Sequence, residues 1–247
     1  MLTILVINSK GGSGKTTLTT NLASYYASKE YRTAIMDYDP QGSSLHWLRM
    51  RPADRDPIHG ANAAPAKGGM VLHSKTSWIP VDTEVLVIDA PAGASGLLLK
   101  ELVRRSNYIL IPVAPSPIDI HATADFIKDL YLIGGAITAK AKIAVAANRV
   151  RNRNAAPYAA LERFLGSLKL PFLTSISDSE TYLAAIELGL GVFEMDESLT
   201  SAERREFIPI LKWLEGSFPN RYGIRADDKL INLESSKQYA AYRGRKM

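Results

Sequence analysis

The chain has 247 residues, of which 46% are hydrophobic and 22% are charged, and this balance excludes a wholly disordered or fibrous protein. It contains no cysteine, which excludes disulfides, Fe–S clusters and thiolate-bound zinc. Lysine and arginine number 30 against 25 acidic residues, and no apolar run reaches the length of a membrane span. We therefore expect a soluble, cytoplasmic protein with a net charge of +5.

Short apolar segments alternate with helical patterns along most of the chain. Residues 2–8 predict a buried strand, because the run is apolar throughout, and residues 15–29 predict a helix with one apolar face. Further strands are expected at 33–36, 85–88, 108–113 and 143–147, and further helices at 96–105, 120–133, 157–168, 179–188 and 201–214. This alternation predicts an α/β fold, with a mostly parallel central sheet covered by helices on both faces.

Two segments interrupt the alternation. Residues 51–80 are rich in Pro, Ala and Gly, and they predict a long irregular connection. Residues 217–247 contain seven basic and three acidic side chains, which makes them a basic tail. The expected organisation is therefore one domain, residues 1–216, followed by this tail.

A glycine-rich segment, KGGSGKTT at residues 10–17, joins the first strand to the first helix. Backbone N–H groups and the positive end of the helix dipole would surround a phosphate there. Lys15 would reach the β and γ phosphates of a nucleotide, and the Thr16 hydroxyl would bind Mg²⁺. The nucleotide-binding residues expected in this segment are Gly11, Gly12, Ser13, Gly14, Lys15, Thr16 and Thr17. The alternative is an ordinary glycine turn, which the strand–helix context and the Gly-Lys-Thr sequence argue against.

The segment departs from the standard phosphate-loop pattern, because Ser9 stands where that pattern has glycine. With its extra lysine, Lys10, it resembles the deviant loop of the ParA/MinD superfamily of partition and positioning ATPases, which share the P-loop NTPase fold. In that family the early lysine reaches across a dimer interface to the phosphates bound by the partner subunit. The resemblance thus implies a catalytic role for Lys10, and a solvated loop lysine is the alternative.

Two acidic motifs follow the second and third expected strands. DYDPQG contains Asp37 and Asp39, and IDAPAG contains Asp89. Parallel strands place their carboxyl ends at one edge of a sheet, so these carboxylates should converge on the phosphate loop. The motifs resemble the two switch motifs of the family, which implies that Asp89 and Asp37 serve Mg²⁺ and that Asp39 positions the attacking water. A helix cap or turn is the alternative for any one aspartate.

The resemblance continues over about residues 1–215 with less specific motifs. Asn148 matches the family asparagine that binds adenine, although a strand-end turn is the alternative. Ser177 and Asp178 align with the other side of the adenine pocket, but the family usually has proline at the position of Ser177. The glycine turn GLGV, residues 189–192, also aligns with the family.

The resemblance implies a slow, partner- and DNA-stimulated ATPase that is a homodimer when ATP is bound. It also implies nonspecific binding of double-stranded DNA on the nucleoid and movement of a cargo through a ParB-like or other adaptor protein. We expect the short type, because no helix-turn-helix precedes the first strand, and no membrane binding, because QYAAYRGRKM lacks a bulky apolar face. The alternative function is a metabolic ATP-dependent amidoligase or synthetase of the cobyrinic-acid or dethiobiotin type.

Candidate DNA contacts are basic side chains, since nonspecific binding rests on contacts to phosphates. They are Arg204, Arg205, Lys212, Arg221 and Arg225, together with Arg149, Arg151, Arg153 and the tail. A solvated surface is the alternative for each of them. The family often carries an arginine just after the adenine segment, where this chain has Ser179-Glu180-Thr181, so the sequence does not locate the DNA surface.

Overall fold

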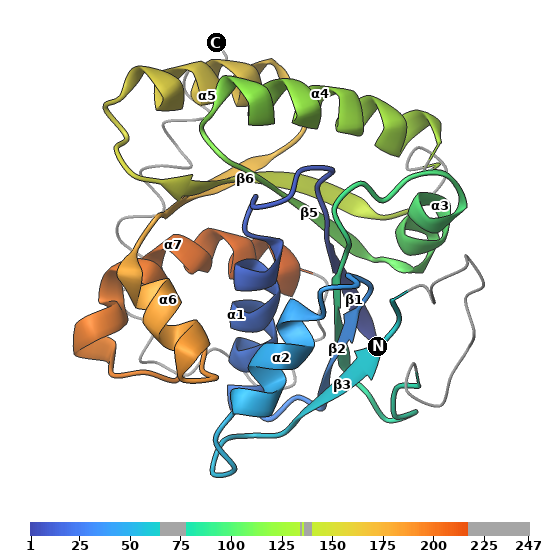
Figure 1. Ribbon diagram of the computed structural model, residues 1–247, viewed down its shortest axis with the longest axis vertical. Coiled ribbons are helices and arrows are strands. Elements are labelled where there is room, and N and C mark those ends of the chain that lie inside the picture. The colour runs from blue at the N-terminus through green and yellow to red at the C-terminus, as the bar shows by residue number, and fades with distance from the viewer. Residues whose placement is uncertain (65–77, 134, 136–139, 217–247) are drawn as a thin grey trace.

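Seven parallel strands form one sheet at the centre of the protein (Figure 1), for which a computed structural model describes residues 1–64, 78–133, 135 and 140–216. The strand order is β3-β2-β4-β1-β5-β6-β7. The strands are β1 (Leu2–Val6), β2 (Thr33–Asp37), β3 (Ile58–Asn62), β4 (Val85–Asp89), β5 (Tyr108–Val113), β6 (Lys142–Val150) and β7 (Phe172–Ser177). The phosphate loop therefore follows a central strand, with both acidic motifs on one side of it.

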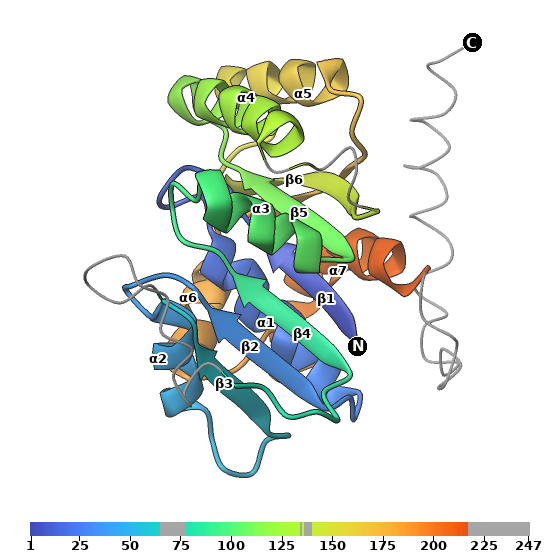
Figure 2. The same ribbon diagram turned by 90° about the vertical axis from the view of Figure 1, so that its right-hand side faces the viewer.

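Helices cover both faces of the sheet, as Figures 1 and 2 show. One face carries α3 (Gly96–Arg105), α4 (Pro117–Leu132) and α5 (Ala156–Ser167). The opposite face carries α1 (Lys15–Ser28), α2 (Ser43–Met50), α6 (Glu180–Glu187) and α7 (Glu197–Glu215). None of the helices in the described ranges is long and apolar enough to cross a membrane.

The buried side chains form two cores, one on each face of the sheet. Along β1, Leu5 packs into the core beneath α3, α4 and α5, whereas Ile4 and Val6 pack into the core beneath α1 and α7. All three side chains are fully buried. This burial on both faces explains why the central strands are apolar throughout, since alternate side chains point to opposite faces.

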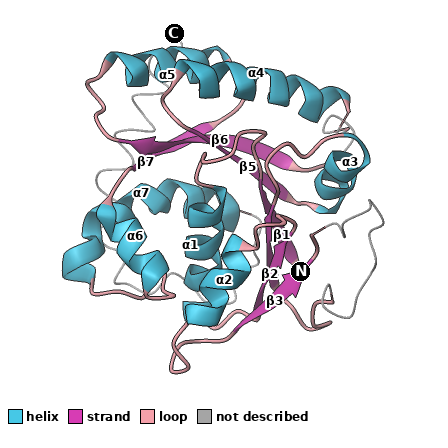
Figure 3. Ribbon diagram, in the orientation of Figure 1, coloured by secondary structure: helices cyan, strands magenta, loops and turns pink. Residues whose placement is uncertain are grey.

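The α/β fold predicted from the sequence is confirmed, and one connection is corrected. Residues 51–80 are not wholly irregular, because Ile58–Asn62 forms β3 at the edge of the sheet (Figure 3). The segment was obscure in sequence because it is short, contains Gly60 and is only partly buried. The expected basic tail, residues 217–247, lies outside the described residues, so the domain boundary stays a prediction.

The helix α2 and the strand β7 were not predicted from the sequence, and α7 begins four residues earlier than predicted. Asp196 caps α7, because its carboxylate accepts hydrogen bonds from the backbone N–H of Ser198 at 2.8 Å and from its hydroxyl at 2.7 Å. That cap starts the helix at Glu197. The element α2 has only two buried residues, so its apolar signal in the sequence is weak.

Candidate functional site

The phosphate loop runs from the end of β1 to the first turn of α1. Gly12 and Gly14 have φ angles of +75° and +85°, a left-handed conformation that favours glycine. A Cβ atom on Gly14 would also lie 1.9 Å from Nδ2 of Asn148, so only glycine fits there. The local sequence thus produces the tight turn that leaves the first N–H groups of α1 without intrahelical partners.

Lys15 is the buried cation of this loop. Its side-chain ammonium donates to the backbone carbonyls of Asn8 at 3.3 Å and Lys10 at 2.9 Å, so it lies inside the loop of its own subunit. Burial lowers the pKa of the Lys15 ammonium from its ordinary value, and the carboxylates of Asp89 and Asp39 offset part of this effect. Phosphate oxygens would satisfy the buried charge in the way the two carbonyls now do.

Asp89 is the buried anion beside it, at the carboxyl end of β4. Its side chain is almost fully buried, and its Oδ2 atom has no hydrogen-bond partner. Burial raises the pKa of Asp89 to about 7; Asp37 and Asp39 add to the rise, while a hydrogen bond from Thr16 and the charge of Lys15 oppose it. Buried polar atoms normally have a partner, and a bound cation would provide one for Oδ2 of Asp89.

The donor set fits Mg²⁺ bound together with a nucleotide. Within the described part of the chain, no three or more His, Asp or Glu side chains gather closely enough to hold a metal by themselves. Mg²⁺ is commonly held by one or two protein oxygens together with waters and substrate phosphates. Thr16 at the start of α1 and Asp89 at the end of β4 would supply those oxygens beside the phosphate loop.

Asp37 has a full set of protein partners. Its Oδ1 accepts from the backbone N–H of Asp39 at 2.9 Å. Its Oδ2 accepts from the N–H of Ser44 at 3.2 Å, from the Ser44 hydroxyl at 2.7 Å and from the N–H of Leu45 at 3.3 Å. The carboxylate therefore anchors the start of α2, a role that the sequence analysis gave only as the general alternative. Its place in the metal shell stays a prediction.

Asp39 lies in the exposed turn between β2 and α2. Its Oδ1 accepts from the N–H of Gln41 at 2.9 Å, and its carbonyl accepts from the N–H of Gly42 at 2.9 Å. Gly42 has a φ of +62°, which allows this turn. The side chain is close enough to interact electrostatically with Lys15 and Asp89, as the convergence of the strand ends predicted. Its water-positioning role stays a prediction.

Asn148 is buried at the end of β6 and contacts the phosphate loop directly. Its Nδ2 donates to the carbonyl oxygen of Ser13 at 2.8 Å. This bond commits one N–H of the amide and leaves Oδ1 as an acceptor of the kind that the amino group of adenine needs. Asn148 was predicted only to bind adenine, and the structure adds a supporting contact to the loop.

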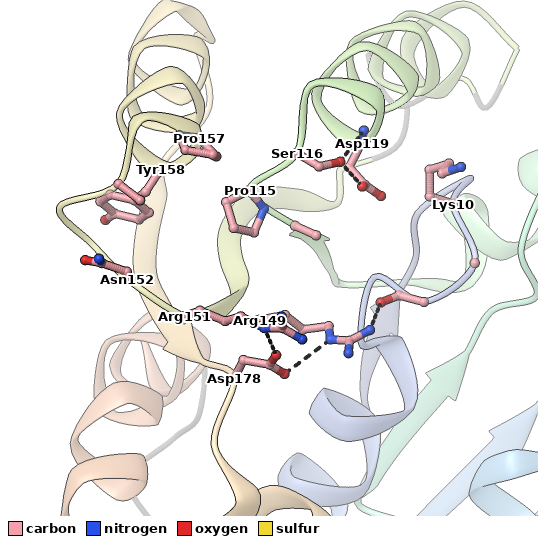
Figure 4. A pocket seen from close by; sticks show the side chains of 14 residues that line it. Lys10, Pro115, Ser116, Asp119, Arg149, Arg151, Asn152, Pro157, Tyr158 and Asp178 are labelled. Carbon is pink, nitrogen blue, oxygen red and sulfur yellow. Dashed lines mark hydrogen bonds and ion pairs between the residues drawn. The ribbon is translucent and has the colours of Figure 1, made fainter.

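A cleft of about 560 Å³ opens beside the loop (Figure 4). Lys10 lies on the side of the start of α4, and Arg149, Arg151 and Asp178 lie together on the other side. Asp178 pairs with Arg149 at 3.4 Å and with Arg151 at 2.8 Å, and these arginines lower the pKa of its carboxyl. Asp178 and the phosphate loop therefore line the same cleft.

Ser177 does not line this cleft. Its backbone N–H and hydroxyl donate to Oε2 of Glu206 at 2.9 and 3.0 Å, so Ser177 is bound to α7. These contacts favour a positioning role for Ser177 and do not test its assignment to the adenine pocket.

Arg149 is a site residue that the sequence analysis assigned only as a DNA candidate. Its backbone φ is +57°, which is unusual for a residue other than glycine. Its Nη1 donates to the carbonyl oxygen of Gly12 at 3.2 Å. The only sequence signal for this link is its position next to Asn148.

One of the DNA candidates, Arg204, is bonded within the protein. Arg204 donates to the carbonyls of Val192 at 3.2 Å, Phe193 at 3.4 Å and Met195 at 2.7 Å, so its guanidinium holds the segment before α7. These bonds occupy its guanidinium, and its role in DNA binding stays a prediction. Arg205 and Lys212 are exposed on α7 and stay candidates, and Arg221 and Arg225 lie outside the described residues.

A glycine loop with a buried lysine, together with a buried aspartate at the end of a neighbouring parallel strand, defines a P-loop nucleotide-binding protein. A family described as the CobQ/CobB/MinD/ParA nucleotide binding domain matches residues 4–192. The chain belongs to this family, and the resemblance noted in KGGSGKTT is thereby confirmed.

Among its relatives, the chain is 28% identical to the maintenance of carboxysome distribution protein A of Halothiobacillus neapolitanus over 200 residues, which cover 78% of this chain and 87% of that protein. It is 31% identical to the chromosome-partitioning ATPase Soj of Thermus thermophilus over 127 residues, 49% of this chain and 50% of Soj.

Solved structures share the fold. A protein described as a plasmid partition protein from Borrelia burgdorferi, bound to AMPPNP, has a TM-score of 0.66 at 17% identity, covering 86% of this chain and 99% of that one. A variant of Cyanothece McdA in complex with ATP has a TM-score of 0.63 at 15% identity, covering 87% and 95%.

Proposed function

We propose that the protein is a Mg²⁺-dependent ATPase that works as a molecular timer in positioning or partitioning a large cargo. The observation that carries the ATPase is the juxtaposition of two buried, opposite charges at the loop, Lys15 and the unpartnered oxygen of Asp89. A buried charge pair of this kind is costly without a ligand, and a nucleotide with its metal would satisfy both groups.

In the proposed reaction a water attacks the γ-phosphorus of ATP, the bond to the bridging β–γ oxygen breaks, and ADP and phosphate leave. Lys15 would neutralise charge on the β and γ phosphates, and Asp39 would orient the water. Thr16 and Asp89 would hold Mg²⁺, whose chemistry when bound is the neutralisation of phosphate charge. Asn148 would accept a hydrogen bond from adenine.

We further propose that the ATP-bound form is a homodimer joined across the carboxyl edge of the sheet. Lys10 lines the cleft at this edge, where it is available to phosphates of a second subunit. Leu97, at the start of α3, is 87% exposed, and Ile118, at the start of α4, is 71% exposed. These helices follow the strands on either side of β1, so the two apolar side chains flank the phosphate loop and would be covered in a dimer.

The cargo is inferred from the relatives, whose printed names refer to carboxysome distribution, chromosome partitioning and plasmid partition. We propose that the dimer binds duplex DNA through exposed basic residues such as Arg205 and that a separate adaptor protein on the cargo stimulates hydrolysis. Alternating ATP-bound and ADP-bound forms would then bind and release the nucleoid.

The test measures ATP hydrolysis with Mg²⁺ in the full chain and in two variants. Lys15→Ala should lose ATP binding, because it removes the cation within the loop. Asp39→Ala should bind ATP and dimerise but hydrolyse about 10²–10⁴-fold more slowly, the range for loss of assistance to a proton transfer. Undiminished ATP affinity in Lys15→Ala would overturn the assignment of the loop. Turnover that requires a small-molecule acid and forms an amide would favour the metabolic alternative.

A further inference from the structure

The helix α2 packs on the core mainly through Trp47, with Leu48 and Met50 partly buried beside it. Only Ser44 and Trp47 of its eight residues are buried. A hollow of about 440 Å³ lies between α2, Thr16 at the start of α1 and Ile186 of α6. In addition to this packing, polar contacts at its two ends fix the position of α2.

The first end is held by Asp37. As described above, its carboxylate binds the N–H groups of Ser44 and Leu45 and also the N–H of Asp39. The turn that contains Asp39 connects β2 to the start of α2, and the Asp37 carboxylate therefore contacts both this turn and the helix. A displacement of α2 would move this turn.

The second end is held by a buried ion pair. Arg51, directly after α2, binds Glu194 with two bonds, Nη1 to Oε2 at 2.9 Å and Nη2 to Oε1 at 2.5 Å. The side chains are only 5% and 3% exposed, so both charges depend on each other. Nearby, the indole N–H of Trp47 donates to the carbonyl of Leu190 at 3.2 Å.

The segment that holds this end, residues 189–194, also contacts the helix of the phosphate loop; we call it the bridging turn. The N–H of Val192 donates to Oδ1 of Asn21 in α1 at 2.8 Å. A Cβ atom on Gly191 would lie 1.8 Å from Oγ of Ser24, so the turn packs directly on α1. On the other side, a Cβ atom on Gly189 would lie 2.5 Å from the backbone nitrogen of Arg51. The bridging turn therefore sets the place of α2 relative to α1.

We propose that Glu194 is a positioning residue for ATP hydrolysis. By holding Arg51, it keeps α2 in place and with it the Asp39 turn relative to the phosphate loop on α1. This inference rests on the proposed function, since it requires that Asp39 orient the attacking water. Because Glu194 contacts neither the loop nor the cleft, it acts on the rate of hydrolysis and not on ATP affinity.

The test compares Glu194→Gln with the wild-type chain. Glutamine keeps the shape and an acceptor for the N–H of Gly191, which Glu194 binds at 2.9 Å, but it removes the charge that pairs with Arg51. We expect kcat to fall about 10- to 100-fold, the cost of a displacement near 1 Å, with ATP affinity unchanged. The matched control is Glu203→Gln, which alters another buried glutamate, bound to the hydroxyl of Ser179 at 2.7 Å, and should leave kcat unchanged.

A double-mutant cycle separates positioning from a general loss of stability. If Glu194 acts through Asp39, the variant with both Asp39→Ala and Glu194→Gln should be no slower than Asp39→Ala alone. Two effects that multiply, or a wild-type kcat in Glu194→Gln, would overturn the inference. A wild-type rate in Asp39→Ala would instead contradict the proposed function.

Removing one partner of a buried ion pair can prevent folding, so a milder variant completes the test. Trp47→Phe removes the indole hydrogen bond to Leu190 and makes the buried ring smaller, but it keeps an aromatic side chain and leaves both partners of the ion pair in place. It should lower kcat in the wild-type background and have no further effect beside Asp39→Ala. An unchanged kcat in this variant would also overturn the inference.

Discussion

At the scale of residues, two lysines of the same loop occupy different surroundings. The Lys15 ammonium is buried and donates to two carbonyls of its own loop. Lys10 lines the open cleft beside the start of α4. These surroundings suit Lys15 to the nucleotide of its own subunit and Lys10 to a nucleotide bound by a partner subunit.

The first prediction concerns Lys10→Ala. We expect this variant to bind ATP as the wild type does, because Lys15 remains in the loop, and to lose ATP-dependent dimerisation. Light scattering with ATP and Mg²⁺ measures the molar mass. Lys29→Ala, at the exposed far end of α1, is the control and should still dimerise. A Lys10→Ala dimer as stable as the wild type would contradict a role across the interface.

At the scale of elements, the start of α1 and the end of β6 are joined by close packing. Asn148 donates to the carbonyl of Ser13 and fills the space where Gly14 would carry a side chain. The phosphate loop is thus shaped by a residue more than 130 positions away, and the adenine and phosphate sides of the site are mechanically linked.

The second prediction follows from that packing. Gly14→Ala should lower the free energy of unfolding by at least ~2 kcal/mol, from its left-handed φ and the clash with Asn148, and should weaken ATP binding. Urea denaturation and calorimetric titration measure the two effects. Gly11→Ala is the matched control for the effect on stability, because no atom lies within 4 Å of the added Cβ.

Replacing Asn148 as well distinguishes the two causes. In the variant with both Gly14→Ala and Asn148→Ala, the clash is absent and the backbone strain remains, so part of the stability should return. If the two losses simply add, the packing of Asn148 against Gly14 is not what limits the site.

At the scale of the whole molecule, two adjacent arginines on α7 differ in what they can bind. Arg204 is engaged with three backbone carbonyls, whereas Arg205 is exposed. A net charge of +5 per chain gives a monomer only a modest attraction to DNA, screened beyond about 8 Å at physiological salt. A dimer would double the number of phosphates bound.

The third prediction is that the ATP-bound dimer binds duplex DNA without sequence preference and the ADP-bound monomer does not. Arg205→Ala should reduce the slope of log K against log salt by about 0.9 for each DNA phosphate that is no longer neutralised, equally for all sequences. Fluorescence anisotropy at several salt concentrations measures the slope. An ATP-bound dimer with the DNA affinity of the monomer would contradict the proposal.

Arg204→Ala is the control for that experiment. It should lower the free energy of unfolding by about 1–3 kcal/mol, since three partly buried carbonyls lose a donor, and leave the salt slope unchanged. A change in slope for Arg204→Ala alone would assign the DNA contact to Arg204 instead of Arg205.

The α/β fold, the phosphate loop and the carboxylates at the strand ends could all be predicted from the amino-acid sequence. Apolar strands and the spacing of Gly14, Lys15 and Thr16 are local features, and local features can be recognised without knowing the distant contacts. Parallel strands then place Asp37 and Asp89 at one edge whatever the details of packing, as their direct pairing across β2 and β4 shows.

The partners of the polar groups, in contrast, become visible only in the folded chain. Arg204 and Arg205 are adjacent in the sequence, but nothing in the sequence shows that Arg204 donates hydrogen bonds to three carbonyls of the segment before α7. The ion pair between Arg51 and Glu194 joins residues 143 positions apart, and β3 is held as a strand by its pairing with β2. Such contacts form between segments that are far apart in the sequence and meet only on folding. Neither segment alone therefore shows a periodic pattern that predicts the contact.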